Sequence, residues 1–204
     1  MPRVGRVVSP GSVQHVVNRG NDRRCICLEP VDYASFLVLL REARERFAVR
    51  LHAYCLMPNH FHLVVAADDL SELSAYMHFV ERSHACDLRL VARNRGNGHV
   101  FQRRYWSSEI AGDGHLLCVL RYVEANAVRA GLVDRAEKWE WGSLYERDTG
   151  ERDLLQPLPL PLRLPAGWTT IVNVPLQPVD IAPIRAPRKM GRRAKSAHLR
   201  LPKK

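Results

Sequence analysis

Three features of this sequence predict an α+β fold. Short segments alternate apolar and polar residues, as the strands of a sheet do, and longer segments repeat apolar residues every three or four positions, as amphipathic helices do. The two kinds of segment follow one another in the order β-α-β-β-α-β, with a further helix behind them. That order is the split βαβ, or ferredoxin-like, sandwich, which hosts many unrelated functions, so the fold by itself assigns none.

The four predicted strands are defined by apolar alternation and by the turns that bound them. They cover residues 11–19, 49–56, 60–66 and 100–110. Along the first, Val13, His15 and Val17 share one face, because side chains point alternately to the two sides of a strand. The tight turn Met57-Pro58-Asn59 separates the second strand from the third, which therefore starts at His60.

Three longer segments have the spacing of helices with one apolar face. They cover residues 32–47, 71–91 and 113–130. In the first, Phe36, Leu40 and Phe47 fall on one stripe, with Arg and Glu residues opposite. The third stops before Gly131, because glycine readily adopts the left-handed conformation that is common just past the end of a helix. These helices complete the predicted order of elements.

A change in composition after Trp141 divides the chain into a domain of residues 1–150 and a tail of residues 151–204. Nine of the 13 prolines lie from Pro157 onward, and helical periodicity fades there. The tail holds 11 Lys and Arg residues against 3 acidic ones, which accounts for most of the net charge of +10. We therefore expect a Pro-rich, basic, largely disordered extension. It could clamp nucleic acid through salt-sensitive phosphate contacts, or be a solvated tail without a fixed role.

The cysteine pattern and the hydropathy favour a reduced, cytoplasmic protein. Five scattered cysteines are a poor disulfide framework, and no pair is spaced to complete a zinc site. There is no run of about 18 apolar residues and no signal-peptide core, so we expect no membrane partner. The sequence pI of about 9.8 indicates a polyanionic partner. A nucleoid-associated protein in the cytoplasm fits these properties.

A His-x-His pair opens the third predicted strand. His60 and His62 point to the same side, with their backbones roughly 6–7 Å apart, because side chains alternate along a strand. Both imidazoles could therefore reach one divalent metal ion while Phe61 faces the core. The same spacing also fits two polar residues on the solvent side of a half-buried strand. The strongly apolar run that follows, residues 63–65, and the position at a strand start favour a site.

A second candidate group lies on the last predicted helix. Tyr122 and Asn126 are four positions apart and so share a helix face. The tyrosine could supply an oxygen nucleophile, and the asparagine a carbonyl oxygen as a hard metal ligand. A buried tyrosine bonded to a neighbour, beside a polar residue late in the helix, fits the same pattern.

One reaction suits a tyrosine together with a metal ion held by two histidines. Phosphodiester transesterification needs an oxygen nucleophile and a Lewis acid that stabilises the charge developing on the phosphate. A phosphotyrosine bond also conserves the energy of the broken linkage for rejoining, whereas hydrolysis by water would discard it. The candidate residues are therefore consistent with breaking and remaking phosphodiester linkages.

Four segments of this chain carry a family resemblance. They are residues 17–21, residues 52–65 with His60-Phe61-His62, residues 101–108, and residues 122–133 with Trp141 following. In this order they closely resemble the single-tyrosine, HUH-type transposases of the IS200-like family, particularly the REP-associated tyrosine transposases. The likeness runs from about residue 12 to residue 145. The chain departs from the family pattern at Ala127, where proline is usual.

The resemblance implies a fold, a reaction and a set of site residues. The fold is a ferredoxin-like HUH nuclease core within residues 1–150. His60 and His62 would hold Mg²⁺ or Mn²⁺, with Asn126 as the third ligand. Tyr122 would attack single-stranded DNA and give a 5′-phosphotyrosyl intermediate and a free 3′-OH. The implied partner is single-stranded or hairpin-forming DNA.

Further residues are candidates for contact with DNA. Phosphate contacts are predicted for four arginines, and stacking on unpaired bases for two aromatic residues. The six residues are Arg19, Arg103, Arg104, Arg121, Tyr105 and Trp106. Each could equally be a solvated charge or a core aromatic residue.

Two other functions compete with transposition. One is a related HUH nuclease of plasmid replication or conjugation, which the compact size and the lone helix tyrosine disfavour. The other is a catalytically idle ferredoxin-like regulator that binds nucleic acid. The sequence leaves open whether the protein is a monomer or a homodimer.

Overall fold

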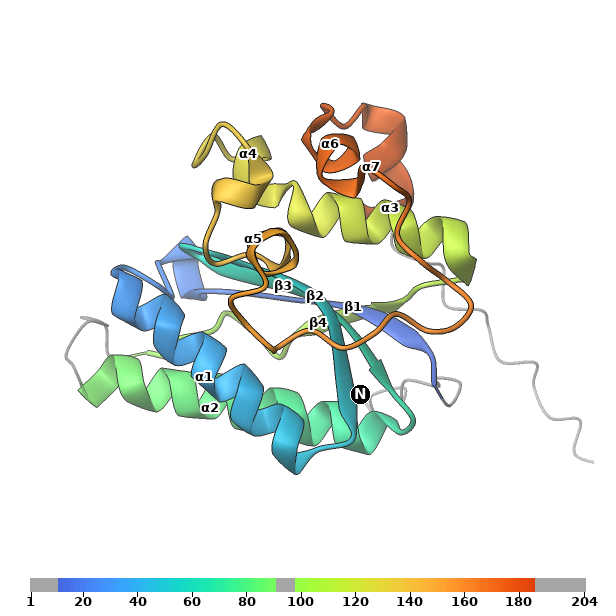
Figure 1. Cartoon of the computed structure of the whole chain (residues 1–204). Helices are drawn as coiled ribbons and strands as arrows, with labels where there is room; N and C mark the ends of the chain where they lie inside the picture. Colours follow the sequence, from blue (N-terminus) through green and yellow to red (C-terminus); the bar gives the residue numbers. More distant parts are fainter. Residues whose placement is uncertain (1–10, 91–97, 186–204) are drawn as a thin grey trace, which may run out of the picture.

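A four-stranded antiparallel sheet organises the computed structural model, which describes residues 11–90 and 98–185 (Figure 1). The strand order is β2-β3-β1-β4, so the two central strands are the first and third in the chain. This order confirms the ferredoxin-like arrangement. The strands are β1 (Val13–Arg19), β2 (Val49–Met57), β3 (His60–Ala67) and β4 (Trp106–Glu109).

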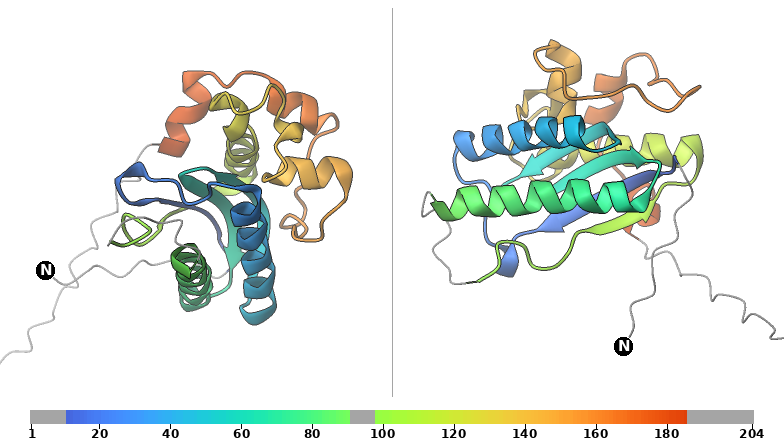
Figure 2. Two further views of the ribbon diagram at one scale, coloured as in Figure 1. Left: turned by 90° about the vertical axis from the view of Figure 1, so that its left-hand side faces the viewer. Right: turned by 90° about the horizontal axis from the view of Figure 1, so that it is seen from below.

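Helices cover both faces of the sheet, as the views in Figures 1 and 2 agree. On one face lie α1 (Pro30–Arg46) and α2 (Leu70–Leu90), side by side. The other face is covered by α3 (Gly112–Glu124), which continues into the short helix α4 (Asn126–Arg129). The remaining elements are η1 (Asn21–Arg23), η2 (Ala136–Lys138), α5 (Ser143–Thr149), α6 (Trp168–Asn173) and α7 (Pro178–Arg185). Within residues 11–90 and 98–185, none of these helices is long and apolar enough to span a bilayer.

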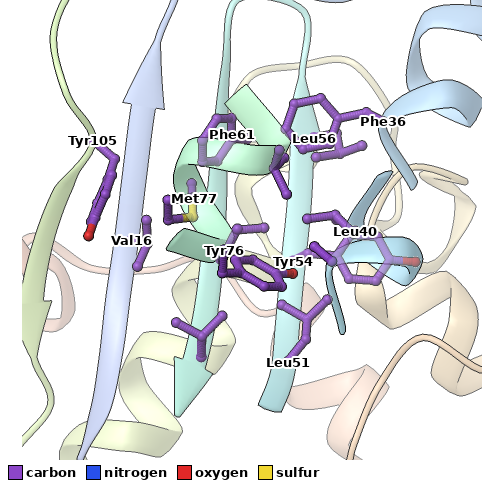
Figure 3. Close-up of a cluster of buried hydrophobic side chains, with 14 of the residues drawn as sticks. Val16, Phe36, Leu40, Leu51, Tyr54, Leu56, Phe61, Tyr76, Met77 and Tyr105 are labelled. Carbon is purple, nitrogen blue, oxygen red and sulfur yellow. The ribbon is translucent and has the colours of Figure 1, made fainter. Parts of the chain in front are cut away.

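The face under α1 and α2 is packed with large apolar side chains (Figure 3). Phe61 of β3 meets Phe36 of α1 with ring centroids 5.3 Å apart, and Tyr54 and Tyr76 are fully buried nearby. His84 of α2 is buried there, and its Nε2 lies 2.7 Å from the Ile26 carbonyl oxygen. These large side chains are buried and close-packed, so this face contributes mainly to the stability of the domain.

The face under α3 is built from smaller side chains. Four small residues of β2 and β3 are completely buried against Leu120 and the rest of α3: Ala53, Cys55, Val64 and Ala66. Small residues let a helix approach a sheet closely. Strand β3 is therefore buried on both faces, and the half-buried strand considered from the sequence is not what forms.

The edge of the sheet at β2 is covered by later parts of the chain. The Leu56 amide donates to the Trp141 carbonyl oxygen (2.9 Å), and Nε1 of Trp139 donates to the Leu56 carbonyl oxygen (3.0 Å). Farther along, the Gln156 amide donates to the Leu51 carbonyl oxygen (2.8 Å). These contacts satisfy backbone groups that an edge strand would otherwise expose.

Residues 151–185 differ from the disordered extension that the sequence predicts from residue 151 onward. Residues 151–156 lie beside β2, and the later part packs over α3, where Trp168, Val172 and Ile184 are buried in the same cluster as the helix (Figure 1). The segment holds 16 apolar residues among its 35, and these three are placed so that they are buried together. Side-chain hydrogen bonds with α3 also hold it. Residues 186–204, which carry most of the basic charge of the tail, lie outside the described residues.

Two other elements differ from their predicted bounds. The strand expected over residues 100–110 is regular only at β4, because residues 98–105 form loop contacts with the β1–α1 connection, such as the Asn21 amide to the Val100 carbonyl oxygen (2.8 Å). The single helix expected over residues 113–130 is interrupted at Ala125. All five cysteines are free thiols in the structure.

Candidate active site

The two histidines lie at the start of the central strand β3, on the face that α3 covers. His60 pairs with Arg19 of β1, and His62 with Val17, so both sit between two neighbouring strands. Their ring centroids are 5.1 Å apart. This confirms that the two side chains share one side of the strand while Phe61 points to the core beneath α1.

The ring nitrogens of His60 are distinguished by a hydrogen bond. Nδ1 lies 2.7 Å from Oδ1 of Asn59 and donates to it, because an amide oxygen can only accept. In the neutral ring, Nε2 then carries the free lone pair. The turn that holds Asn59 is itself fixed, since its carbonyl oxygen accepts from the Gly20 amide at 2.9 Å.

A third histidine, His15 of β1, belongs to this cluster. Its Nε2 lies 2.9 Å from Nδ1 of His62, and the two rings are stacked with centroids 5.2 Å apart. His15 was not predicted as a site residue from the sequence. Alternation had placed it on one face of β1, and knowledge that β1 pairs with β3 would have brought it beside His62.

Tyr122 of α3 lies over the histidines. Its ring centroid is 5.6 Å from that of His62 and 6.1 Å from that of His15, both in edge-on orientation. The Arg129 guanidinium carbon lies 4.7 Å from the ring centroid, so a cation stacks on the tyrosine. The structure thus brings the predicted nucleophile and the predicted His-x-His pair together, and adds the positive charge of Arg129, which was not predicted from the sequence.

Asn126 starts α4, just past the interruption at Ala125. Its side chain is buried, and Nδ2 has no hydrogen-bond partner. A buried amide left unpaired is costly, so native proteins usually satisfy such a group or use it. Asn126 therefore has an unpaired N–H donor close in sequence to Tyr122.

Burial keeps all three histidines neutral at neutral pH. Desolvation, followed by the charge of His115, lowers the pKa of His15 to about 4. Desolvation, with Arg19 nearby, also lowers the pKa of His60 to about 4. The pKa of His62 is well below its ordinary value, first because of burial and then because of the neighbouring histidines and arginines. Neutral imidazole is the form that binds metal ions.

The donor set fits a divalent ion only if a residue other than His, Cys, Asp or Glu takes part. No group of three or more such side chains in residues 11–90 and 98–185 is placed to hold a metal. His60 and His62 supply two nitrogen donors from neutral rings, and the side-chain oxygen of the buried Asn126 amide is the candidate third donor. A mixed nitrogen and oxygen set of this kind suits Mg²⁺ or Mn²⁺.

Three of the predicted DNA-contact arginines are exposed. Arg19 ends β1, and Arg103 and Arg104 lie in the loop before β4. The Gln102 amide donates to the Arg19 carbonyl oxygen (2.9 Å), so the two basic segments are adjacent. Trp106 is 43% exposed, and its ring stands edge-on to His15 with centroids 5.8 Å apart. These residues border the histidine cluster on one side.

The other two residues predicted to contact DNA, Tyr105 and Arg121, make contacts within the protein. Tyr105 is buried in the core beneath α1 and α2, on the opposite side of the sheet from its neighbour Trp106. Arg121 donates from Nε to the Ile171 carbonyl oxygen (3.0 Å) and from Nη2 to that of Val174 (2.9 Å). The alternation between adjacent residues thus separates Tyr105 from the site, and α6 engages Arg121.

Comparison with known proteins relates this arrangement to DNA transposition. Residues 11–126 match the sequence model of the family described as IS200-like transposases. The chain is similar to a Haemophilus influenzae protein assigned to the REP-associated tyrosine transposases, with 26% identity over 123 residues, which is 56% of this chain and 70% of the relative. It is also similar in fold to a solved REP-associated tyrosine transposase bound to a REP hairpin, with a TM-score of 0.59 and 16% identity, covering 78% of this chain and 93% of the other.

Proposed function

This chain belongs to the IS200-like transposase family, and from that premise we propose that it nicks and rejoins hairpin-forming single-stranded DNA by transesterification at Tyr122. The observation that carries the proposal is the position of Tyr122 edge-on to His62, with ring centroids 5.6 Å apart. An oxygen nucleophile and neutral nitrogen donors are thereby within reach of one phosphate group.

In the proposed reaction, the Tyr122 oxygen attacks the phosphorus of a DNA linkage and the 3′ oxygen of the preceding nucleotide leaves as a 3′-OH. The tyrosine is then joined to the 5′ phosphate of the remaining strand. Arg129, stacked on the Tyr122 ring, places positive charge beside the phosphate that the tyrosine would meet. Attack by a 3′-OH on the phosphotyrosine reverses these steps and joins strands.

His60, His62 and Asn126 are the residues that we propose hold Mg²⁺ or Mn²⁺. A bound ion would polarise the scissile phosphate and stabilise its developing charge. Nε2 of His60 is available for this role, since Nδ1 donates to Asn59. His62 can offer Nε2 when its Nδ1 donates to His15, so His15 would orient His62 and select its tautomer.

Hairpin DNA is proposed as the partner because the similar solved transposase is bound to a REP hairpin. The exposed residues Arg19, Arg103 and Arg104 supply phosphate contacts beside the site. Trp106, close to His15, offers an exposed ring on which an unpaired base can stack.

Formation of a covalent protein–DNA adduct tests the proposal. The substrate is 3′-labelled DNA with a hairpin stem and randomised single-stranded flanks, so that no cleavage sequence is assumed. Wild-type protein with Mn²⁺ should give a labelled adduct that survives a denaturing gel. Tyr122→Phe and wild type with EDTA should give none, because the nucleophile or the metal ion is removed.

Two results would contradict parts of this proposal. An adduct that persists in Tyr122→Phe would exclude Tyr122 as the nucleophile. Hairpin binding by the wild-type protein without an adduct in either metal ion would instead support a regulator that binds DNA and does not cut it. Tyr33→Phe is a matched control, since Tyr33 is also buried but lies beneath Trp139 and Trp141, away from the histidines.

A further inference from the structure

Glu124 is a buried carboxylate two residues beyond Tyr122 on the same helix. Its side chain is fully enclosed, yet it receives three hydrogen bonds. Oε1 accepts from Ser143 Oγ (2.7 Å) and from Arg147 Nε (2.8 Å), and Oε2 accepts from Trp168 Nε1 (2.6 Å). A carboxylate is costly to bury unless it is fully bonded, so this group joins three elements at one point.

The partners of Glu124 all lie outside the part of the chain that matches the family model, residues 11–126. Ser143 and Arg147 belong to α5, and Trp168 begins α6. Arg147 also donates from Nη2 to the His52 carbonyl oxygen of β2. The carboxylate is therefore anchored to the sheet as well as to the C-terminal segment.

Arg121 makes a second set of contacts with the same segment, from the residue just before Tyr122. In addition to its bonds to the carbonyl oxygens of Ile171 and Val174, its Nη1 lies 3.8 Å from Asp180 of α7. Arg121 and Glu124 are three positions apart and so share one face of α3. Tyr122 lies on another face, toward the histidines of the sheet.

We propose that Glu124 is a positioning residue for the transposition reaction and that residues 143–180 act as a clamp on the tyrosine helix. The clamp holds α3 at two points on either side of Tyr122, which fixes the distance and angle between the tyrosine and His62. This inference rests on the proposed function of Tyr122. It assigns to the C-terminal segment a role in the rate of strand cleavage rather than in DNA binding, because its contacts with α3 are made behind the tyrosine.

Trp168→Phe is the variant that tests the clamp. It keeps an aromatic side chain but removes the donor to Glu124 Oε2. We expect the rate of adduct formation on hairpin DNA to fall about 10- to 100-fold, since misplacing a reacting group by about 1 Å can cost this much. The dissociation constant for the same DNA should stay within about twofold. Backbone amides of α3 and α4 should exchange with solvent faster.

Trp139→Phe is the matched control. Trp139 is partly buried and, like Trp168, donates from Nε1, but its acceptor is the Leu56 carbonyl oxygen of β2 (3.0 Å) rather than a group on α3. We expect it to lose a similar amount of stability while retaining the wild-type rate of adduct formation. Equal rates in the two variants would overturn the proposal, because a general loss of stability would then explain both.

Three further variants keep the test decisive if Trp168→Phe does not fold. Ser143→Ala removes one bond to Glu124 without enlarging a side chain, and should lower the adduct rate by about 3- to 10-fold. Glu124→Gln should recover more activity than Glu124→Ala, because the amide retains an acceptor for Trp168. A wild-type rate in Ser143→Ala would refute the clamp. Absence of any adduct in wild-type protein would instead reject the proposed function itself.

Discussion

The two faces of the sheet differ in size of side chain and in chemistry. Beneath α1 and α2, aromatic and branched residues such as Phe36, Phe61 and Tyr76 fill the space. Beneath α3, alanine, cysteine and valine line most of the strands, and the larger groups are His15, His62 and the tyrosine above them. Alternation assigns neighbouring residues of β3 to these two different environments.

This difference separates stability from chemistry within a single strand. Phe61 supplies apolar volume to one core, whereas His60 and His62 on either side of it supply nitrogen donors to the other face. A change at Phe61 should therefore alter folding, and a change at His60 should alter reaction. The predictions below test whether the two faces can be perturbed independently.

The largest expected effect is on folding. Phe61→Ala should lower the free energy of unfolding by about 3–5 kcal/mol, because it leaves a cavity in the core beneath α1. Denaturant unfolding measures this loss, and Phe61→Leu should cost less than half as much. Under conditions in which Phe61→Leu and the wild-type protein are both folded, their rates of adduct formation on hairpin DNA should agree within a few fold. A selective loss of adduct in Phe61→Leu would show that the two faces are coupled.

The next effect is on chemistry. His60→Ala should reduce adduct formation by about 10²–10³-fold, as removal of one group that stabilises developing charge typically does. Hairpin binding should remain, and the free energy of unfolding should change by about 1 kcal/mol or less, since His60 is only partly buried. The check is adduct yield against DNA binding in one preparation. Wild-type yield in this variant would remove His60 from the proposed metal site.

The smallest effect concerns a titratable group on the packing face. Glu81 of α2 accepts from Asn18 Nδ2 at 2.7 Å, and burial raises the pKa of Glu81 to about 7. The pKa of Glu81 is higher in the folded than in the unfolded protein. The contribution of Glu81 to the free energy of unfolding is therefore fully present below about pH 4.5 and is lost as the pH rises to about 7. Glu81→Gln should match the wild type near pH 4.5 and exceed it above pH 7 by on the order of 1–2 kcal/mol, since solvent reaches part of the side chain.

Urea unfolding of both proteins at several pH values measures the Glu81 effect. The difference between the two proteins isolates Glu81, because contributions from the buried histidines are common to both. Parallel stability curves across this pH range would refute the prediction. Adduct formation should be the same in both proteins above pH 7, since Asn18 and Glu81 lie on the face away from Tyr122.

The shared side of His60 and His62 followed directly from strand periodicity, and the register of β3 confirms it. The position of His15 could not be obtained in this way. Alternation gives the face of each strand but not which strands are neighbours, and His15 meets His62 only because β1 pairs with β3. Helix spacing and the family resemblance predicted Tyr122 and Asn126 as site residues. The fold places Tyr122 beside His15 and His62.

The C-terminal segment was the element least predictable from sequence. Its prolines and weak periodicity are typical of an extended chain. What orders it is long-range contact, since Trp168 and the backbone of Ile171 and Val174 bond to Glu124 and Arg121 of α3. For the same reason Arg121 resembled a free phosphate contact, because a single basic residue on a helix gives no sign of a distant acceptor.

Residues 139–142 and 154–156 cover the β2 edge, and this cover determines how a shortened form of the protein should behave in solution. A shortened protein that ended near residue 138 would expose the backbone amides and carbonyl oxygens of Leu51 and Leu56 along an apolar strand. Such an open edge invites a strand from another molecule, so association and precipitation are expected. Truncation would therefore both loosen α3 and cause self-association, so its effect on activity could not be assigned to either cause. Single substitutions such as Trp168→Phe change the contacts with α3 and leave the β2 edge covered.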